Sequence, residues 1–177
     1  KHQWLLEFLE SLEGQKVLVL CSTKADVLSL DRFLQKESGI KKGVFHEDLD
    51  LLERDKQAAW FAQPKGAQLL ISSEVGGEGR NFQFCHKMVL FDLPKHPDLI
   101  EQRIGRLDRI GQGSKIEVYV PWVAKSEEEV FFRWYHEGLN CCEESWSGLA
   151  AIEEKFHESL TEISQGFLDK KNVSVEM

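Results

Sequence analysis

Short apolar runs alternate with amphipathic segments along the first two thirds of the chain. The strand-like runs are residues 16–21, 43–46, 67–72, 87–92 and 115–121. The first of them, KVLVLC, is continuously apolar, which is typical of a strand buried on both faces of a sheet. Between the strands, apolar residues recur at helical spacing. This order predicts an α/β domain, a parallel sheet with helices on both faces.

Polar residues and helix breakers lie where these helices are expected to begin and end. Ser22 or Thr23 can cap the first helix, and Gly39 lies where a left-handed stop is expected. Asp48 or Asp50 can cap the second, which Pro64 ends. A third helix is predicted over residues 98–110, which carry apolar side chains at helical spacing.

The last third of the chain lacks the strand–helix alternation. Ser126-x-x-Glu129 has the spacing of a capping box and predicts a helix that Gly138 weakens near its end. A further helix is predicted over about residues 149–163. We therefore expect two domains, an α/β domain over residues 1–121 and a helical extension over 122–177.

Charge is unevenly distributed between these two parts. Residues 1–121 carry 17 Lys and Arg against 18 Asp and Glu, whereas residues 122–177 carry 5 against 12. Proteins that bind polyanions usually have a basic excess, so any contact with nucleic acid is expected to be local or shared with another domain. The acidic tail is better suited to a protein partner.

Other features of composition narrow the class of protein. No uncharged apolar run approaches the roughly 20 residues of a membrane span. The four cysteines contain no C-x-x-C pair, so we expect free thiols, a reducing compartment and no metal site. The chain opens on Lys1 without a signal-peptide pattern, which we interpret as a segment of a longer protein.

The segment EQRIGRLDRIGQ, residues 101–112, concentrates arginine. Helical spacing would place Gln102, Arg106 and Arg109 near one face, with Arg103 beside them. None of the three arginines has an acidic residue three or four positions away in the helix. Such a cluster is expected to face a polyanion or acids from elsewhere in the fold, although a solvated basic stripe remains an alternative.

Two further segments follow predicted strands. In SSEVGGEGRN, residues 72–81, the glycines 76, 77 and 79 would let the backbone approach a phosphate, and two serine hydroxyls could contact a nucleic-acid backbone. It contains no Walker A pattern, and a structural turn is an alternative. Thr23 and Lys24 follow the first strand, where Thr23 could equally cap a helix. All three segments are expected at the carboxyl edge of the sheet, where α/β domains bind ligands.

In this order and spacing, the segments resemble motifs IV, V and VI of the superfamily-two helicase-like ATPases. ISSEVGGEGRNFQFCHKMVLFDLP resembles motif V of the Swi/Snf group, and EQRIGRLDRIGQ resembles its motif VI. Within that group, PDLIEQRIGRLDRIGQ and FFRWYHEGLNCCEES are similar to a bacterial branch that associates with RNA polymerase.

The resemblance implies the second of two RecA-like lobes, of the P-loop NTPase superfamily. ATP and Mg²⁺ would be held mainly by a first lobe in cis, since this chain has no Walker A lysine. Arg106 and Arg109 match the motif VI arginine fingers, Gln102 matches a position that couples the lobes, and Glu78 and Gly79 fall where motif V lines the nucleotide.

DNA contacts are also implied by the resemblance. The residues that fall near the DNA backbone are Ser72, Ser73, Gly76, Gly77, Asn81 and, as a weaker candidate, Thr23. The implied function is a DNA-dependent ATPase that moves along double-stranded DNA, binds RNA polymerase and stimulates its recycling, in the bacterial cytoplasm at the nucleoid. The fragment alone would be inactive. Two alternatives remain open: a non-enzymatic α/β interaction module, and a flavodoxin-like phosphate binder.

Overall fold

The computed structural model of the chain describes residues 1–74, 81–94, 96, 98–107 and 115–140. These residues belong to two compact units. The first comprises Lys1–Asp92 and Arg103–Pro121, and the second comprises Leu93–Gln102 and the described residues after 121. Among the described residues, no helix is long and apolar enough to cross a membrane.

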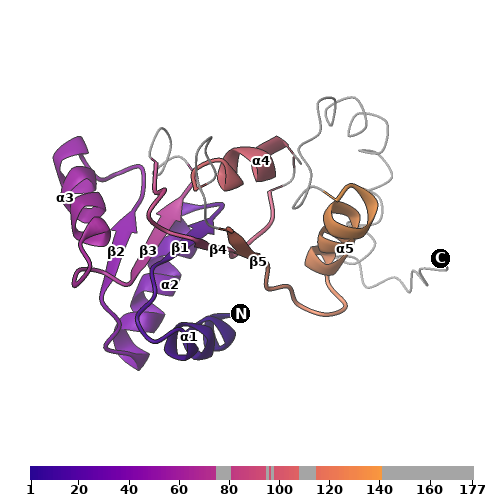
Figure 1. Ribbon diagram of the computed structural model, residues 1–177. Coiled ribbons are helices and arrows are strands. Elements are labelled where there is room, and N and C mark those ends of the chain that lie inside the picture. Colours follow the sequence, from indigo (N-terminus) through magenta and orange to yellow (C-terminus); the bar gives the residue numbers. More distant parts are fainter. Residues whose placement is uncertain (75–80, 95, 97, 108–114, 141–177) are drawn as a thin grey trace. The chain divides into compact units, whose positions relative to one another are not determined.

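A five-stranded parallel sheet forms the centre of the first unit (Figure 1). Its strands are β1 (Val17–Cys21), β2 (Lys42–Phe45), β3 (Leu69–Ser73), β4 (Lys87–Leu90) and β5 (Glu117–Tyr119). Their order in the sheet is β2-β3-β1-β4-β5, and every neighbouring pair is parallel. The predicted parallel α/β fold is therefore confirmed. The central strands β1 and β3 are buried at every residue, and the sequence of β1, VLVLC, is continuously apolar, as expected for a strand covered on both faces.

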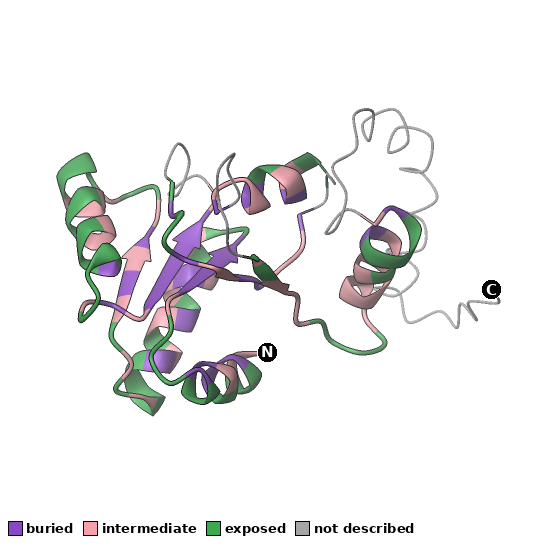
Figure 2. Cartoon of the chain, viewed as in Figure 1, coloured by how far each residue is buried: buried purple, intermediate pink, exposed green. Residues whose placement is uncertain are grey.

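Helices cover both faces of the sheet. The first unit contains α1 (His2–Ser11), α2 (Lys24–Glu37) and α3 (Leu51–Ala62). Alternate sheet residues pack with α1 and α2 in one buried cluster, which includes Val19, Ile71, Val89, Leu9 and Leu30. The opposite face meets α3: a Cβ built on Gly43 would lie 3.0 Å from Leu70 and 3.1 Å from Gln57 of α3. Figure 2 shows the buried sheet between partly exposed helices.

The helix boundaries follow local chemistry, with two corrections to the sequence analysis. The side chain of Thr23 caps α2 and that of Asp50 caps α3, and α3 ends before Pro64 as predicted. Helix α1 was not predicted, although Leu5, Leu6 and Leu9 are buried at helical spacing. The left-handed stop predicted at Gly39 is wrong, because Ser38 ends α2 in an extended conformation and its hydroxyl donates to the Leu34 carbonyl at 2.8 Å.

The described part of the second unit contains α5 (Glu127–Arg133), which continues into a π-helical turn, η1 (Trp134–Gly138). Ser126 caps α5 as predicted, and the turn ends at Gly138. The buried Tyr135 hydroxyl donates to the Pro94 carbonyl at 2.7 Å. The helix predicted over 149–163 lies outside the described residues.

Candidate functional site

The carboxyl edge of the sheet brings three strand ends together. Leu20 of β1 is in register with Ser72 of β3 and with Leu90 of β4. Because the strands are parallel, the residues that follow them, including Ser22, Glu74 and Asp92, emerge at the same edge. This edge is where the sequence analysis expected its three segments to meet.

The guanidinium of Arg103 lies at the centre of this edge, and only 1% of the residue is exposed. Its Nε donates to Glu74 Oε1 at 3.2 Å and its Nη2 donates to Glu74 Oε2 at 2.8 Å, so the carboxylate is bound by two parallel hydrogen bonds. Nη1 donates to the Asp92 carbonyl at 2.7 Å, and Nη2 also donates to Ser22 Oγ at 3.3 Å. One side chain therefore ties together the ends of β1, β3 and β4.

The sequence analysis expected the arginines to face either a polyanion or acidic residues from elsewhere in the fold. For Arg103, the structure shows the second arrangement. Its carboxylate partner, Glu74, lies 29 positions earlier in the sequence. A rule based on helical neighbours does not detect such a pair. The feature of the sequence that could have revealed the pair is the position of Glu74 directly after a buried strand, at the sheet edge that also carries Arg103.

The helix that carries Arg103 is shorter than predicted. Helix α4 (Asp98–Ile104) was expected to continue to residue 110, but residues 105–107 form a turn. Arg106 N–H donates to the Arg103 carbonyl at 3.3 Å and Leu107 N–H donates to the Ile104 carbonyl at 2.9 Å. Gly105 stands where the helix stops, in keeping with the low helix propensity of glycine. Arg106 thus lies on a turn and not on a helical face.

Arg106 contacts both flanks of the glycine-rich segment. Its Nη2 donates to the Glu74 carbonyl at 3.1 Å, just before that segment. Its own carbonyl accepts from Phe82 N–H at 3.0 Å, just after it. Phe82 is 2% exposed and so anchors this second contact in the core. The segment that resembles motif V and the turn that resembles motif VI are therefore joined at two points.

Asp92 joins the end of β4 to the loop after β1. Its Oδ1 accepts from Ser22 N–H at 2.7 Å. Burial raises the pKa of Asp92 above its ordinary value, while the hydrogen bonds from Ser22 and the positive charge of Arg103 act in the opposite direction. The carboxyl group thus fixes the backbone of Ser22, whose hydroxyl oxygen accepts from Arg103 Nη2.

Two of the predicted DNA contacts are buried serines with partners inside the domain. Ser72 Oγ donates to the Ser73 carbonyl at 2.9 Å, and Ser73 Oγ donates to Glu47 Oε2 at 2.9 Å. A hydrogen bond within Glu47 itself, with the bond from Ser73, lowers the pKa of the Glu47 carboxyl. A DNA contact by these serines stays a prediction.

The other predicted site residues are placed as follows. Thr23 Oγ1 accepts from Asp26 N–H at 3.2 Å as the cap of α2, and neighbouring Lys24 forms an ion pair with Asp48. Asn81 is exposed after the glycine-rich segment, and Gln102 is exposed on α4 within the second unit. The remaining predicted site residues lie outside the described part of the chain: Gly76, Gly77, Glu78, Gly79 and Arg109.

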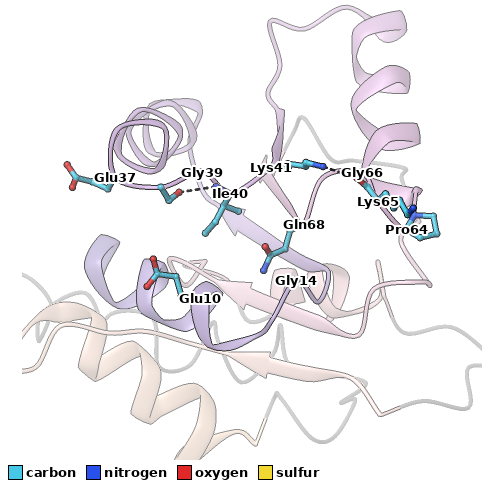
Figure 3. A pocket seen from close by; sticks show the side chains of 11 residues that line it. Glu10, Gly14, Glu37, Gly39, Ile40, Lys41, Pro64, Lys65, Gly66 and Gln68 are labelled. Atoms are coloured by element: carbon cyan, nitrogen blue, oxygen red, sulfur yellow. Dashed lines mark hydrogen bonds between the residues drawn. The ribbon is translucent and has the colours of Figure 1, made fainter.

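A surface hollow lies at the opposite edge of the sheet (Figure 3). Residues that precede the strands line it, among them Gly14, Lys41 and Gln68. Lys41 Nζ donates to the Lys65 carbonyl across its wall at 3.3 Å. None of the predicted site residues lines this hollow, so the candidate site remains the carboxyl edge.

The parallel sheet, with the segments that resemble motifs V and VI joined at its carboxyl edge, is the arrangement of a helicase-type lobe, and comparison with known proteins agrees. The chain belongs to the family of the helicase conserved C-terminal domain, whose family model matches residues 1–111. The model of the RNA polymerase recycling family C-terminal region matches residues 115–176.

The chain is also similar to individual proteins that share one name. The chain is 50% identical over 159 residues to the RNA polymerase-associated protein RapA of Cronobacter sakazakii, which is 89% of this chain and 16% of that protein. It is 48% identical over the same length to RapA of Klebsiella pneumoniae. The predicted resemblance to the RNA polymerase-associated ATPases is confirmed. The chain spans 16% of the length of these relatives.

Solved structures show the same fold at low sequence identity. The C-terminal part of the Fun30 ATPase domain has a TM-score of 0.69 at 20% identity, covering 95% of this chain and 52% of that one. The C-terminal domain of Dbp5 from S. cerevisiae has a TM-score of 0.58 at 20% identity, covering 87% and 89%. These likenesses establish the RecA-like fold of a helicase C-terminal lobe.

Proposed function

We propose that this chain is the second motor lobe of an ATP-dependent enzyme that moves along double-stranded DNA and promotes RNA polymerase recycling. Membership of the helicase C-terminal family supports the ATPase part of this proposal. The observation that carries it is the position of Arg106, on a turn at the carboxyl edge, with contacts to both flanks of the glycine-rich segment.

In the proposed reaction, ATP lies between this lobe and a first lobe, which supplies most of the contacts to the triphosphate and Mg²⁺. Arg106 and Arg109 direct guanidinium groups at the γ-phosphate oxygens as negative charge develops. Such fingers contribute roughly 10³–10⁵ in rate in related phosphoryl transfers. A guanidinium held in place beforehand needs no reorganisation during the reaction. Glu78 and Gly79 line the nucleotide, and Gln102 couples the lobes.

The proposed grip on DNA is made through its backbone. Asn81 supplies an exposed amide, the backbone at Gly76 and Gly77 follows the strand, and Ser72, Ser73 and Thr23 complete the set. A grip on phosphates makes binding independent of sequence and weaker in high salt. Alternate closing and opening of the lobes would then move the enzyme along the duplex.

The proposed protein partner is RNA polymerase. The relatives from Cronobacter and Klebsiella are RNA polymerase-associated proteins by name, and residues 115–176 match the recycling family's C-terminal model. The excess of acidic residues after position 121 suits a protein surface better than a nucleic acid. We place the protein in the cytoplasm, at the nucleoid.

The test is ATP hydrolysis by the intact two-lobe protein with Arg106→Ala and Arg109→Ala, with and without DNA. We expect turnover to fall by roughly 10³-fold or more while nucleotide affinity is largely retained. Arg32→Ala is the matched control, because Arg32 is an exposed residue of α2. Unchanged hydrolysis by Arg106→Ala would overturn the motor proposal and favour a non-enzymatic interaction module. The isolated chain is expected to hydrolyse no ATP.

A further inference from the structure

The ion pair between Glu74 and Arg103 has no place in the proposed reaction, yet it is a deeply buried charged contact among the described residues of this edge. The Arg103 side chain is 1% exposed and the Glu74 side chain 26% exposed. Water therefore has little access to the guanidinium. Withdrawing a charge from water is costly unless a partner of good geometry replaces the solvent, and the Glu74 carboxylate supplies that partner through two hydrogen bonds.

We propose that Glu74 and Arg103 are positioning residues for ATP hydrolysis, which hold the turn that carries Arg106; this inference rests on the motor function proposed above. Glu74 touches both arginines, because its carboxylate binds Arg103 while its carbonyl accepts from Arg106 Nη2 at 3.1 Å. The Arg103 carbonyl also accepts from Arg106 N–H at 3.3 Å. A shift of either residue in the pair is therefore transmitted to Arg106 through one hydrogen bond.

The chemistry of the pair favours positioning over stability. Buried ion pairs add little net stability, and well-packed apolar side chains of similar volume often serve as well or better. A planar guanidinium bound by two parallel hydrogen bonds instead fixes direction, which a flexible or apolar contact cannot do. Arg103 also binds the Asp92 carbonyl and Ser22 Oγ, so the turn is oriented against β1, β3 and β4 together.

The test compares Glu74→Gln, Arg103→Lys and the double variant Glu74→Met with Arg103→Met in the intact two-lobe protein. We expect each to lower kcat for DNA-stimulated ATP hydrolysis by about 10- to 100-fold, the cost of a misplacement of about 1 Å. The KM for ATP should change by less than about threefold, because the substrate is bound mainly elsewhere. The double variant should regain the thermal stability that Glu74→Gln loses, while its kcat stays low.

Asp31→Asn is the matched control. Asp31 binds Lys42 Nζ at 3.0 Å, and the two side chains are 25% and 13% exposed, close to the exposure of Glu74. Lys42 begins β2, at the edge of the sheet opposite to Arg106. Asp31→Asn should lower the Tm without lowering kcat.

Three results would overturn the inference alone. The first is a kcat that recovers together with Tm in the double variant, and the second is wild-type kcat in Arg103→Lys while Arg106→Ala abolishes turnover. The third is an equal loss of kcat in Asp31→Asn, which would reduce the pair to a structural role. If Arg106→Ala itself hydrolyses ATP normally, the motor proposal fails and this inference fails with it.

Discussion

Removal of the Phe82 ring should destabilise the first unit strongly. Phe82 is 2% exposed and lies edge-on to three aromatic rings, those of Phe45, Phe61 and Phe84, with centroid distances of 6.2, 5.9 and 6.3 Å. Truncating a core phenylalanine to alanine costs about 3–5 kcal/mol of unfolding free energy, and the lost edge-on ring contacts place Phe82→Ala near the upper end. That is a large share of the roughly 5–15 kcal/mol that stabilises a typical domain.

Equilibrium unfolding in urea, followed by far-UV circular dichroism, measures this cost. Phe82→Leu keeps most of the volume and should cost less than about 1.5 kcal/mol. Both variants keep the backbone amide that donates to the Arg106 carbonyl. The loss of unfolding free energy in each therefore reports on the side chain of residue 82 and not on this hydrogen bond. Phe84→Ala, at a side chain that is 41% exposed, should cost less than Phe82→Ala. A loss below about 1 kcal/mol for Phe82→Ala would refute the packing argument.

Three other substitutions test separate features by urea unfolding. Asp92→Asn keeps an oxygen that can accept from Ser22 N–H. Because burial raises the Asp92 pKa, the wild type loses stability as pH rises from the ordinary carboxyl pKa of about 4 through the raised pKa, so the variant should gain relative stability over that pH range. A flat difference across that range would contradict the assignment. Thr23→Ala removes the cap of α2 and should cost about 1 kcal/mol, against almost nothing if the cap is not formed. Tyr135→Phe leaves the Pro94 carbonyl without its donor in the second unit and should cost about 1–3 kcal/mol; an unchanged midpoint would exclude that bond.

The fold could be predicted because its central strands are buried on both faces. A continuous apolar run marked β1, a largely apolar run marked β3, and capping residues such as Thr23 and Asp50 marked the helix starts. The helix α1 was missed because no strand precedes it and its N-cap residue, Lys1, provides no side-chain capping hydrogen bond. The end of α2 was predicted wrongly because a glycine was expected there. A serine whose hydroxyl donates to a carbonyl of the last turn, as Ser38 does, can end a helix equally well.

The site was only partly predictable, for a different reason. The motif resemblance singled out Arg106, whose role stays a prediction. The partner of Arg103 was not predicted, because Glu74 is distant in sequence and meets it only through the strand order. Helical spacing also assumed a continuous helix through residue 110, whereas α4 ends at Ile104. Residue spacing within one segment predicts contacts between residues that are close in the sequence. Contacts between distant residues, such as Glu74 and Arg103, depend instead on which strands are neighbours in the sheet.

The bond from the Phe82 amide to the Arg106 carbonyl joins two main-chain groups. Such a bond does not depend on which side chain either residue carries. Only proline at position 82 would delete its donor, since every other amino acid carries the same N–H. Relatives could therefore exchange the side chains at both positions and still inherit the same spacing between the two segments.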